Sequence, residues 1–170
     1  MVNCQRFGNI EKLSRFFLNG QKNLPENHRP ICMTSSICRG LESIINEKIT
    51  GHILSNNLFP SNQHGFICNR STLTQHLNFF NHLTKIQTNK LNSDIVYIDF
   101  SKAFDKISHS KLIYVLSHYK INSTIINWIK NYLHDRTQST VVENKLSYPC
   151  AVTSGVPQGT VLAPLCLIYT

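Results

Sequence analysis

The chain has 170 residues, a formal net charge of +8 at pH 7 and a sequence pI near 9.3. This length predicts one domain that buries about 70% of its unfolded surface, and the charge favours a polyanionic partner such as nucleic acid. A merely basic soluble protein remains the alternative, because Lys and Arg are rarely adjacent. No long apolar run and no charged-then-apolar start occur, so we expect no membrane span, no secretion signal and an intracellular location.

The first half of the chain predicts a helix, a loop and a second helix. Apolar residues at helical spacing predict a core-facing helix from Ser35 to about Ser55, with Ser35 or Ser36 as the N-cap. Its apolar stripe consists of Ile37, Leu41, Ile44, Ile45, Ile49 and Ile53. Clustered Asn, Ser, Pro and Gly then predict a loop. Ser71 is placed to cap the second helix, whose apolar residues are Leu73, Leu77, Phe80 and Leu83.

Residues 94–100, DIVYIDF, predict a buried strand. They are β-branched and aromatic, are bounded by polar residues, and form too short a run for a helix. The run ends on a carboxylate, Asp99, which a buried strand does not need for its own stability. This residue is therefore the first candidate for a functional group.

The second half predicts two helices and a pair of strands. The helices lie around Lys111–His118 and Ser123–His134, and two short strands follow that turn near Glu143. The final stretch, from Ser154 to Thr170, is a Gly/Pro loop that runs into an apolar segment. We expect the last residues of that segment to lack a partner to pack on.

Six cysteines are present, and none belongs to a C-x-x-C pair. We interpret them as small core residues, because disulfides are not expected in a reducing compartment. His64 and Cys68 have the spacing of one helical turn, but Gly65 lies between them in a predicted loop, which disfavours a zinc site.

Two short motifs can support chemistry. A strand that delivers Asp99 from its end can hold Mg²⁺ through carboxylate oxygens; the alternatives are a helix cap or an ion pair with Lys102 or Lys106. The second motif, SGVPQG, joins a rigid proline to two glycines that allow close backbone approach, and its Gln158 both donates and accepts hydrogen bonds. A hairpin turn without a ligand is the alternative for this motif.

Together and in this order, the motifs resemble the reverse transcriptase domain of non-LTR (LINE-type) retrotransposons. The resemblance runs from about Arg29 to Thr170. It rests on five blocks: RPICMTSSICRGLESIINEKI, FPSNQHGFICNRST, VYIDFSKAFDKISHSKL, INSTIINWIKNYLHDRTQSTVVE and SGVPQGTVLAP. The third block resembles motif A of that family and the fifth resembles motif B. Five ordered blocks are more specific than any one of them.

The resemblance implies roles for the motif A and motif B residues. Asp99 would be the catalytic carboxylate that binds both magnesium ions, and the backbone carbonyl of Phe100 would help to hold one. Phe104 would be the steric gate beneath the nucleotide sugar. Gln158 and Gly159 would line the nucleotide pocket.

Three further residues receive a role with less detail. Arg29 would bind the incoming triphosphate, which suits the planar fork of a guanidinium. Arg70 is assigned to template contact or to a structural role. Asp105 is interpreted as structural, hydrogen-bonding or capping near His109, with metal ligation as the alternative.

The fold that the resemblance implies is α+β: the fingers and a partial palm of a right-hand polymerase, without a thumb. Residues 1–28 would be an N-terminal extension, 29–93 fingers blocks, and 94–170 a partial palm with motifs A and B. The partners would be an RNA template, a DNA primer and deoxynucleoside triphosphates, with two Mg²⁺ ions and no membrane. The oligomeric state is not predicted.

The chain also departs from the family pattern. It has no Asp-Asp pair, which the family's motif C supplies as aromatic-x-Asp-Asp. Ile67 and Asn69 stand where basic or small residues are usual, and Ala163 stands where glycine is usual. We therefore expect a domain truncated before motif C: a reverse transcriptase by descent that is inactive by itself. The alternatives are a non-catalytic nucleic-acid-binding remnant and an unproductive fragment.

Overall fold

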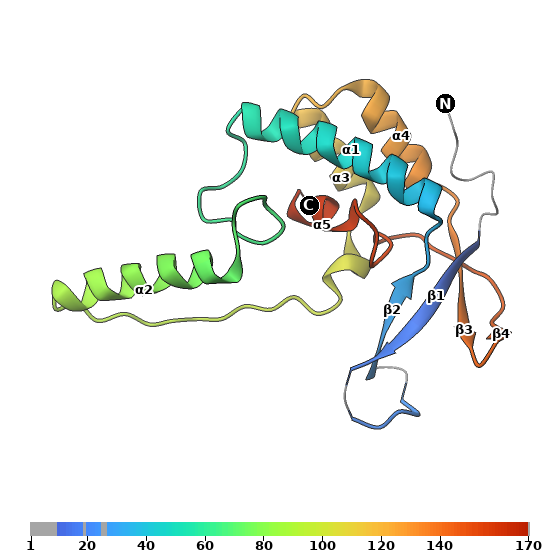
Figure 1. The fold of residues 1–170 in the computed structure, drawn as a ribbon, viewed down its shortest axis with the longest axis horizontal. Helices are drawn as coiled ribbons and strands as arrows, with labels where there is room; N and C mark the ends of the chain where they lie inside the picture. Colours follow the sequence, from blue (N-terminus) through green and yellow to red (C-terminus); the bar gives the residue numbers. More distant parts are fainter. Residues whose placement is uncertain (1–9, 19, 25–26, 170) are drawn as a thin grey trace.

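The computed structural model describes residues 10–18, 20–24 and 27–169. A five-stranded sheet lies on one side of the molecule and a group of helices packs beside it. Residues 72–100, a helix and the extended segment after it, reach away from both (Figure 1). The expected class, mixed α and β with a sheet, is confirmed. Cys4 and the rest of the expected N-terminal extension before residue 10 lie outside the described residues.

The sheet is built from strands at both ends of the chain. The strands are β1 (Ile10–Phe17), β2 (His28–Cys32), β3 (Thr137–Val142), β4 (Lys145–Leu146) and β5 (Cys150–Ala151). Their order is β2-β1-β3-β4, and β5 also pairs with β3. The β1–β3 pair is parallel and the other pairs are antiparallel. The sheet therefore brings the start of the chain beside residues more than a hundred positions later.

Strand β1 lies within the expected N-terminal extension, where no strand was predicted. Leu13 of β1 is opposite Cys32 of β2 on one side and Thr140 of β3 on the other. The sheet therefore continues across the boundary expected at Arg29. Leu13 is buried whereas Lys12 and Ser14 are exposed, so an alternating pattern is present but short and weak.

The predicted strand pair near Glu143 is confirmed. Glu143 and Asn144 connect β3 to β4 with φ angles of 48° and 62°. Positive φ at both central residues is typical of a two-residue hairpin turn, because its twist matches that of the strands. Strand β5, which was not predicted, pairs with the other end of β3.

The four predicted helices are confirmed, with the predicted ends reproduced to within two residues. The helices are α1 (Ser36–Ser55), α2 (Thr72–Thr88), α3 (His109–His118), α4 (Ser123–Leu133) and α5 (Ala163–Ile168), with a 3₁₀ turn η3 (Ala103–Lys106) before α3. Helix α5 and the turn η3 were not predicted. Ser35 caps α1 by accepting from Cys38 N, and Ser71 caps α2 in a reciprocal capping box with Thr74. These caps satisfy backbone donors that the first turn leaves free.

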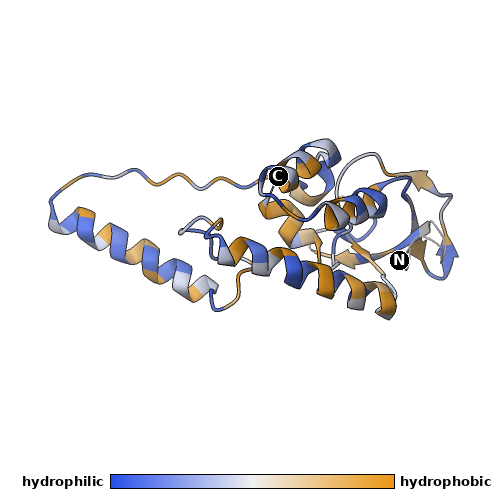
Figure 2. Ribbon diagram, turned by 90° about the horizontal axis from the view of Figure 1, so that it is seen from above, coloured by the Kyte–Doolittle hydropathy of each residue, from blue (hydrophilic) through white to orange (hydrophobic). Residues whose placement is uncertain are grey.

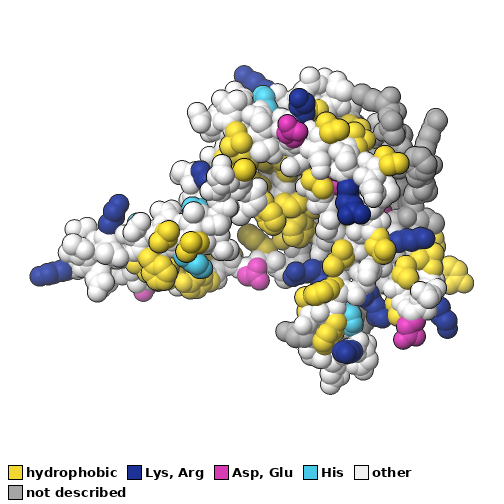
Figure 3. Space-filling view, in the orientation of Figure 1, with side chains coloured by type: hydrophobic (Ala, Val, Ile, Leu, Met, Phe, Trp, Pro, Cys, Tyr) yellow, Lys and Arg dark blue, Asp and Glu magenta, His cyan; other side chains and the backbone are white. Residues whose placement is uncertain are grey.

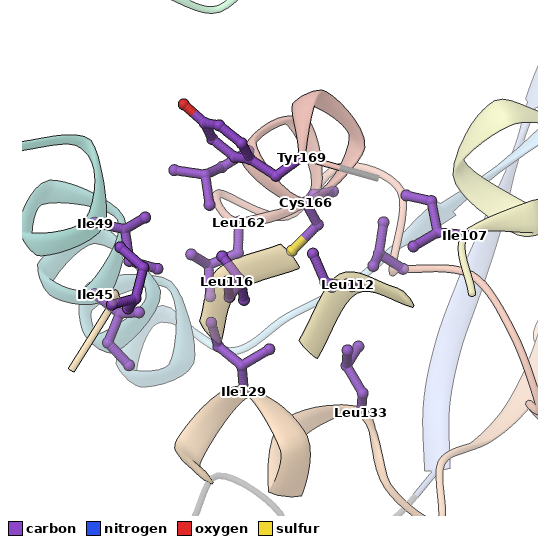
Figure 4. Close-up of a cluster of buried hydrophobic side chains, with 14 of the residues drawn as sticks. Ile45, Ile49, Ile107, Leu112, Leu116, Ile129, Leu133, Leu162, Cys166 and Tyr169 are labelled. Atoms are coloured by element: carbon purple, nitrogen blue, oxygen red, sulfur yellow. The ribbon is translucent and has the colours of Figure 1, made fainter. Parts of the chain in front are cut away.

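The hydrophobic core lies where α1, α3, α4 and α5 meet (Figure 4). From α1, Ile45, Ile49 and Ile53 are at most 8% exposed. Ile37 and Ile44 of the same predicted stripe are more than half exposed. The buried face of α1 is narrower than predicted, because the helix covers the cluster from one side only.

The expectation that the last apolar residues lack a partner is wrong. Leu165 and Cys166 of α5 are buried, and Tyr169 is 4% exposed. The Tyr169 ring lies 5.8 Å from that of Phe59 and 5.3 Å from that of Tyr119. The segment turns into a short helix that α1 and α3 enclose, so it finds its core among residues that precede it.

The prediction of a buried strand at 94–100 is also wrong. The segment is extended but pairs with no strand of the described sheet, and Val96, Tyr97 and Ile98 are 79%, 84% and 78% exposed. It runs back alone from the tip of α2 to the helices (Figure 2). A strand needs a neighbour for its backbone hydrogen bonds, and β-propensity by itself does not supply one.

The core interpretation of the cysteines holds for two of the five described ones. Cys32 and Cys166 are buried, and burial raises the pKa of each thiol to about 12. Cys68 and Cys150 are exposed, so they do not belong to the core.

In the expected loop, His64 Nδ1 lies 2.8 Å from Thr74 Oγ1. No helix among the described residues is long and apolar enough to cross a bilayer.

Candidate functional site

Two pockets are lined by residues of η3 or its neighbours. The first, of about 340 Å³, is called here the polar pocket; its lining includes Lys102, Asp105, Arg136, Ser154 and Gln158. The second, of about 650 Å³, is called the Asp99 pocket; its lining includes Asp99, Phe100, Lys106 and Lys111. The structure therefore places the motif A carboxylate and the motif B glutamine in different pockets.

The motif B segment is attached to η3 by its backbone. Gly155 N donates to Ile107 O at 2.8 Å, and Val156 N donates to Phe104 O at 2.9 Å. Gly155 has a φ of +81°, and a Cβ there would lie 2.7 Å from Asp105 Cα. Only glycine fits this position, because both the backbone angle and the space exclude a side chain.

A side-chain bond also joins the two motifs. Gln158 Nε2 donates to Asp105 Oδ1 at 2.8 Å, and Ser154 Oγ donates to the Asp105 carbonyl at 3.0 Å. Asp105 thus has hydrogen-bond partners in motif B. His109, beside which we expected Asp105 to bond, instead has Nε2 2.7 Å from Gly155 O.

The middle of the motif B segment lies against β2, the strand that carries Arg29. Cys32 N donates to Gln158 O at 2.8 Å, and a Cβ on Gly159, whose φ is +90°, would lie 3.0 Å from Ile31 Cγ2. Arg29 is exposed on β2 and lies opposite Phe16. The fold thus brings Gln158 and Gly159 to the strand of Arg29, although these residues are far apart in the sequence.

A buried ion pair at the polar pocket was not predicted. The Arg136 guanidinium donates from Nε and Nη2 to the two carboxylate oxygens of Glu11, each at 2.7 Å, and Nη1 donates to Gly155 O at 3.2 Å. Burial would lower the pKa of Arg136, but the hydrogen bonds and charge of Glu11 raise it. The available signal was Arg136 itself, the Arg of the W-I-x-x-Y-L-x-x-R block.

A buried carboxyl, Glu42 of α1, was not singled out either, although the first block contains it. Its two oxygens accept from Tyr132 OH at 3.1 Å and from Val161 N at 2.9 Å, and the residue is 0% exposed. Burial raises the pKa of Glu42, while these hydrogen bonds act to lower it. Burial also raises the pKa of the Tyr132 hydroxyl.

Asp99 and Phe100 are exposed at the end of the extended segment. Among the described residues, no ion pair joins Asp99 to Lys102 or Lys106, and the N-cap of α3 is Ser108. Lys106 Nζ instead lies 3.4 Å from Ser101 Oγ. Neither non-metal explanation of Asp99 is therefore realised in the structure.

Phe104 and Arg70 both make contacts within the fold. Phe104 is half-buried and packs against the core cluster. The Arg70 guanidinium donates to the backbone carbonyls of Pro60, Ser61 and Gln63, which ties together the loop before α2. These contacts favour the structural side of the Arg70 alternative.

The donor set around Asp99 does not fit two magnesium ions. Asp99 supplies the one carboxylate of its pocket, and two basic residues, Lys106 and Lys111, belong to the same lining. Across the part of the chain that the structure describes, no group of three or more His, Cys, Asp and Glu residues is placed to hold a metal. Two ions would need more carboxylate oxygens than this pocket offers.

Comparison with known proteins agrees with the motifs. Residues 19–170 match the family described as reverse transcriptase (RNA-dependent DNA polymerase). The chain is 32% identical over 141 residues to the probable RNA-directed DNA polymerase from transposon BS of Drosophila melanogaster, covering 83% of this chain and 16% of that protein. It is 28% identical over 145 residues to the corresponding X-element protein of the same species, covering 83% of this chain and 15% of that protein.

A third relative comes from a different species. The chain is 27% identical over 147 residues to the Pol polyprotein from the type-1 retrotransposable element R2 of Popillia japonica, covering 86% of this chain and 20% of that protein. The chain thus spans a fifth or less of the length of these relatives. The resemblance to non-LTR retrotransposon proteins is confirmed, and the chain belongs to the reverse transcriptase family.

Proposed function

We propose that the chain contributes the fingers and part of the palm of an RNA-directed DNA polymerase that transfers deoxynucleotides to a primer 3′-hydroxyl. The observation that carries this proposal is the meeting of motif A and motif B at η3, where Gln158 bonds to Asp105 beside the polar pocket. In the proposed division, residues 29–93 are fingers blocks and 94–170 are partial palm. The thumb is not among these residues.

The proposed nucleotide site uses residues from β2, η3 and motif B. Arg29 binds the triphosphate through its fork of donors, while Gln158, which lines the polar pocket, and the adjacent Gly159 contact the nucleotide. Phe104, which is half-buried against the core, is proposed as the steric gate that penalises a 2′-hydroxyl on the sugar. Arg70 acts indirectly, by fixing the loop before α2. These groups work by positioning the substrate and by stabilising negative charge.

In the proposed chemistry, Asp99 and the Phe100 carbonyl would hold metal in a site that further carboxylates complete. Bound magnesium would supply charge neutralisation for nucleotidyl transfer there. Because Asp99 is the one carboxylate of its pocket, two ions require further carboxylates, and we propose that these 170 residues do not polymerise by themselves. An RNA template and a DNA primer are the proposed partners, which the net charge of +8 attracts.

The test is primer extension and binding with purified residues 1–170. We expect an RNA–DNA template–primer to bind with an affinity that falls steeply with salt, and we expect no extension. Absence of binding at low salt would contradict the proposed function. Extension that Asp99→Asn abolishes, and that the nearby control Asp94→Asn preserves, would contradict the proposed inactivity while confirming the role of Asp99.

The second candidate is a non-catalytic nucleic-acid-binding remnant. The observation that favours it is the composition of the Asp99 pocket, whose lining has one carboxylate and two lysines, Lys106 and Lys111. Under this candidate, magnesium does not change the affinity of the protein for deoxynucleotides. The Asp99→Asn variant binds template–primer as tightly as the wild type does. A magnesium-dependent change in deoxynucleotide affinity that Asp99→Asn removes would favour the polymerase instead.

A further inference from the structure

The backbone from Gly155 to Val161, called here the 155–161 loop, is held at its first residue by two side chains. Gly155 O accepts from Arg136 Nη1 at 3.2 Å and lies 2.7 Å from His109 Nε2. A carbonyl oxygen only accepts, so this contact requires His109 to carry a proton on Nε2. Both lone pairs of the Gly155 oxygen are then used by side chains that come from outside the loop.

The last residue of the loop is held by a third side chain. Val161 N donates to Glu42 Oε2 at 2.9 Å, and Tyr132 OH donates to the other oxygen at 3.1 Å. Glu42 is 0% exposed, so water does not compete for this acceptor. The hydrogen bond to Tyr132 fixes the carboxyl that holds Val161.

Between the two anchored ends lie the residues that face β2 and η3. Gln158 is bonded through its carbonyl to Cys32 N and through its side chain to Asp105. Gly159 comes within 3.0 Å of Ile31 at its missing Cβ position. A shift at either end would move these contacts, because only a few residues separate them from the anchors.

Stability alone does not explain why the Arg136 and Glu42 side chains are buried. Desolvation of an ion pair such as Arg136–Glu11 offsets much of its attraction, and apolar replacement of a buried pair is often neutral or stabilising. Their common feature is geometric, because both bond to the backbone of one loop. Arg136, just before β3, donates to Gly155 O, and Glu42 of α1 accepts from Val161 N.

We propose that Arg136 and Glu42 are positioning residues that hold the two ends of the 155–161 loop and thereby set Gln158 and Gly159 against β2 and η3. Their loss loosens the loop while the helical core stays folded. The consequence for nucleotide affinity rests on the proposed function; the effect on the loop does not.

The first test measures backbone amide exchange of residues 1–170 by NMR. Glu42→Met removes the acceptor of Val161, and we expect the Val161 amide to exchange about tenfold faster or more. Glu42→Gln keeps an acceptor oxygen at the same place, and we expect it to restore slow exchange. Glu47→Met changes an exposed Glu of the same helix and is the matched control.

The second test uses the double variant Glu11→Leu/Arg136→Met. It removes both charges at similar volume, so that neither partner is left buried and unpaired. We expect faster exchange of the Gly155 and Val156 amides, with wild-type exchange in α3 and α4 and a little-changed melting temperature. Arg39→Met, at an exposed position of α1, is the matched control.

The pattern of exchange decides the proposal. Faster exchange spread evenly over the loop and the helices would assign Arg136 and Glu42 to global stability, and unchanged exchange would show that the loop holds itself; either result overturns the proposal. A parallel titration with a fluorescent deoxynucleoside triphosphate and Mg²⁺ should show weaker binding by the same variants. If the wild type binds no nucleotide, the proposed function fails for this chain, while the exchange result still stands.

Discussion

The helical core and the arm carry similar apolar patterns but have opposite surroundings. The arm is defined here as residues 72–100, which comprise α2 and the extended segment after it. In α1, Ile49 and Ile53 are 0% exposed, whereas in α2 Leu77 and Phe80 are 56% and 60% exposed. Hydrophobic side chains accordingly gather on the surface of the arm (Figure 3). An apolar stripe thus specifies a helix in both regions, and burial follows only where other elements supply a facing surface.

Helix α2 owes its form to local interactions. Its capping box at Ser71 and Thr74 satisfies first-turn donors, and it has no buried residue among those described. Helix α1 adds long-range contacts to its cap. The comparison predicts that the same substitution has a large effect in the core and a small one in the arm.

The largest expected effect is loss of a core leucine. Leu116→Ala, at a position that is 0% exposed, should reduce the free energy of unfolding by about 2–5 kcal/mol. The matched arm variant Leu77→Ala should change it by no more than about 0.5 kcal/mol. Urea denaturation followed by circular dichroism measures both. Equal losses would mean that the arm is packed as the core is.

A glycine pair sharpens the same comparison. Gly155→Ala places a side chain on left-handed backbone, which should reduce the free energy of unfolding by about 1–2 kcal/mol. The new Cβ would also lie 2.7 Å from Asp105 Cα. That contact should cost about a further 1–3 kcal/mol, because the backbone atom cannot move aside as a flexible side chain does.

The control for this prediction is Gly51→Ala in α1. A Cβ at Gly51 meets nothing within 4 Å, so the change should stabilise the helix by about 0.5–1 kcal/mol. The two variants should therefore move the midpoint of urea unfolding in opposite directions. A shift in the same direction would contradict the close approach of motif B to η3.

A smaller, pH-dependent effect should come from Glu42. Burial raises its folded pKa above the ordinary value of 4.5, so the folded state binds more protons than the unfolded state between these values. The stability linked to Glu42 is therefore complete below pH 4.5 and declines as the pH rises through the folded pKa. Glu42→Gln should lack this decline in urea titrations at successive pH values, with Glu47→Gln correcting for the change in net charge.

The smallest expected effect is at the extended segment. Ile98→Lys should change the free energy of unfolding by no more than about 0.5 kcal/mol, because Ile98 is 78% exposed. It should also reduce aggregation, since an exposed apolar segment with unpaired backbone groups is an association hazard. A loss of about 2 kcal/mol or more would instead show the buried strand that the sequence predicts.

Local sequence features predicted the helices and the β3–β4 turn, because caps, apolar spacing and turn residues act over a few positions. They did not predict β1, whose alternating pattern is short and whose partners, Cys32 and Thr140, lie far along the chain. They also predicted a strand at 94–100, where the residue types suit a sheet but no neighbouring strand is present.

For the candidate site, the sequence by itself determined the residue types and their order: Asp99 at the end of an apolar run, and two glycines around Gln158. These follow from short motifs that a family shares. Only the tertiary structure decided which groups meet. It joined Gln158 to Asp105, left Asp99 in a separate pocket, and turned Glu42 and Arg136 toward the backbone of one loop. The physical reason is that these contacts join residues up to 119 positions apart, so packing selects them and local propensity does not.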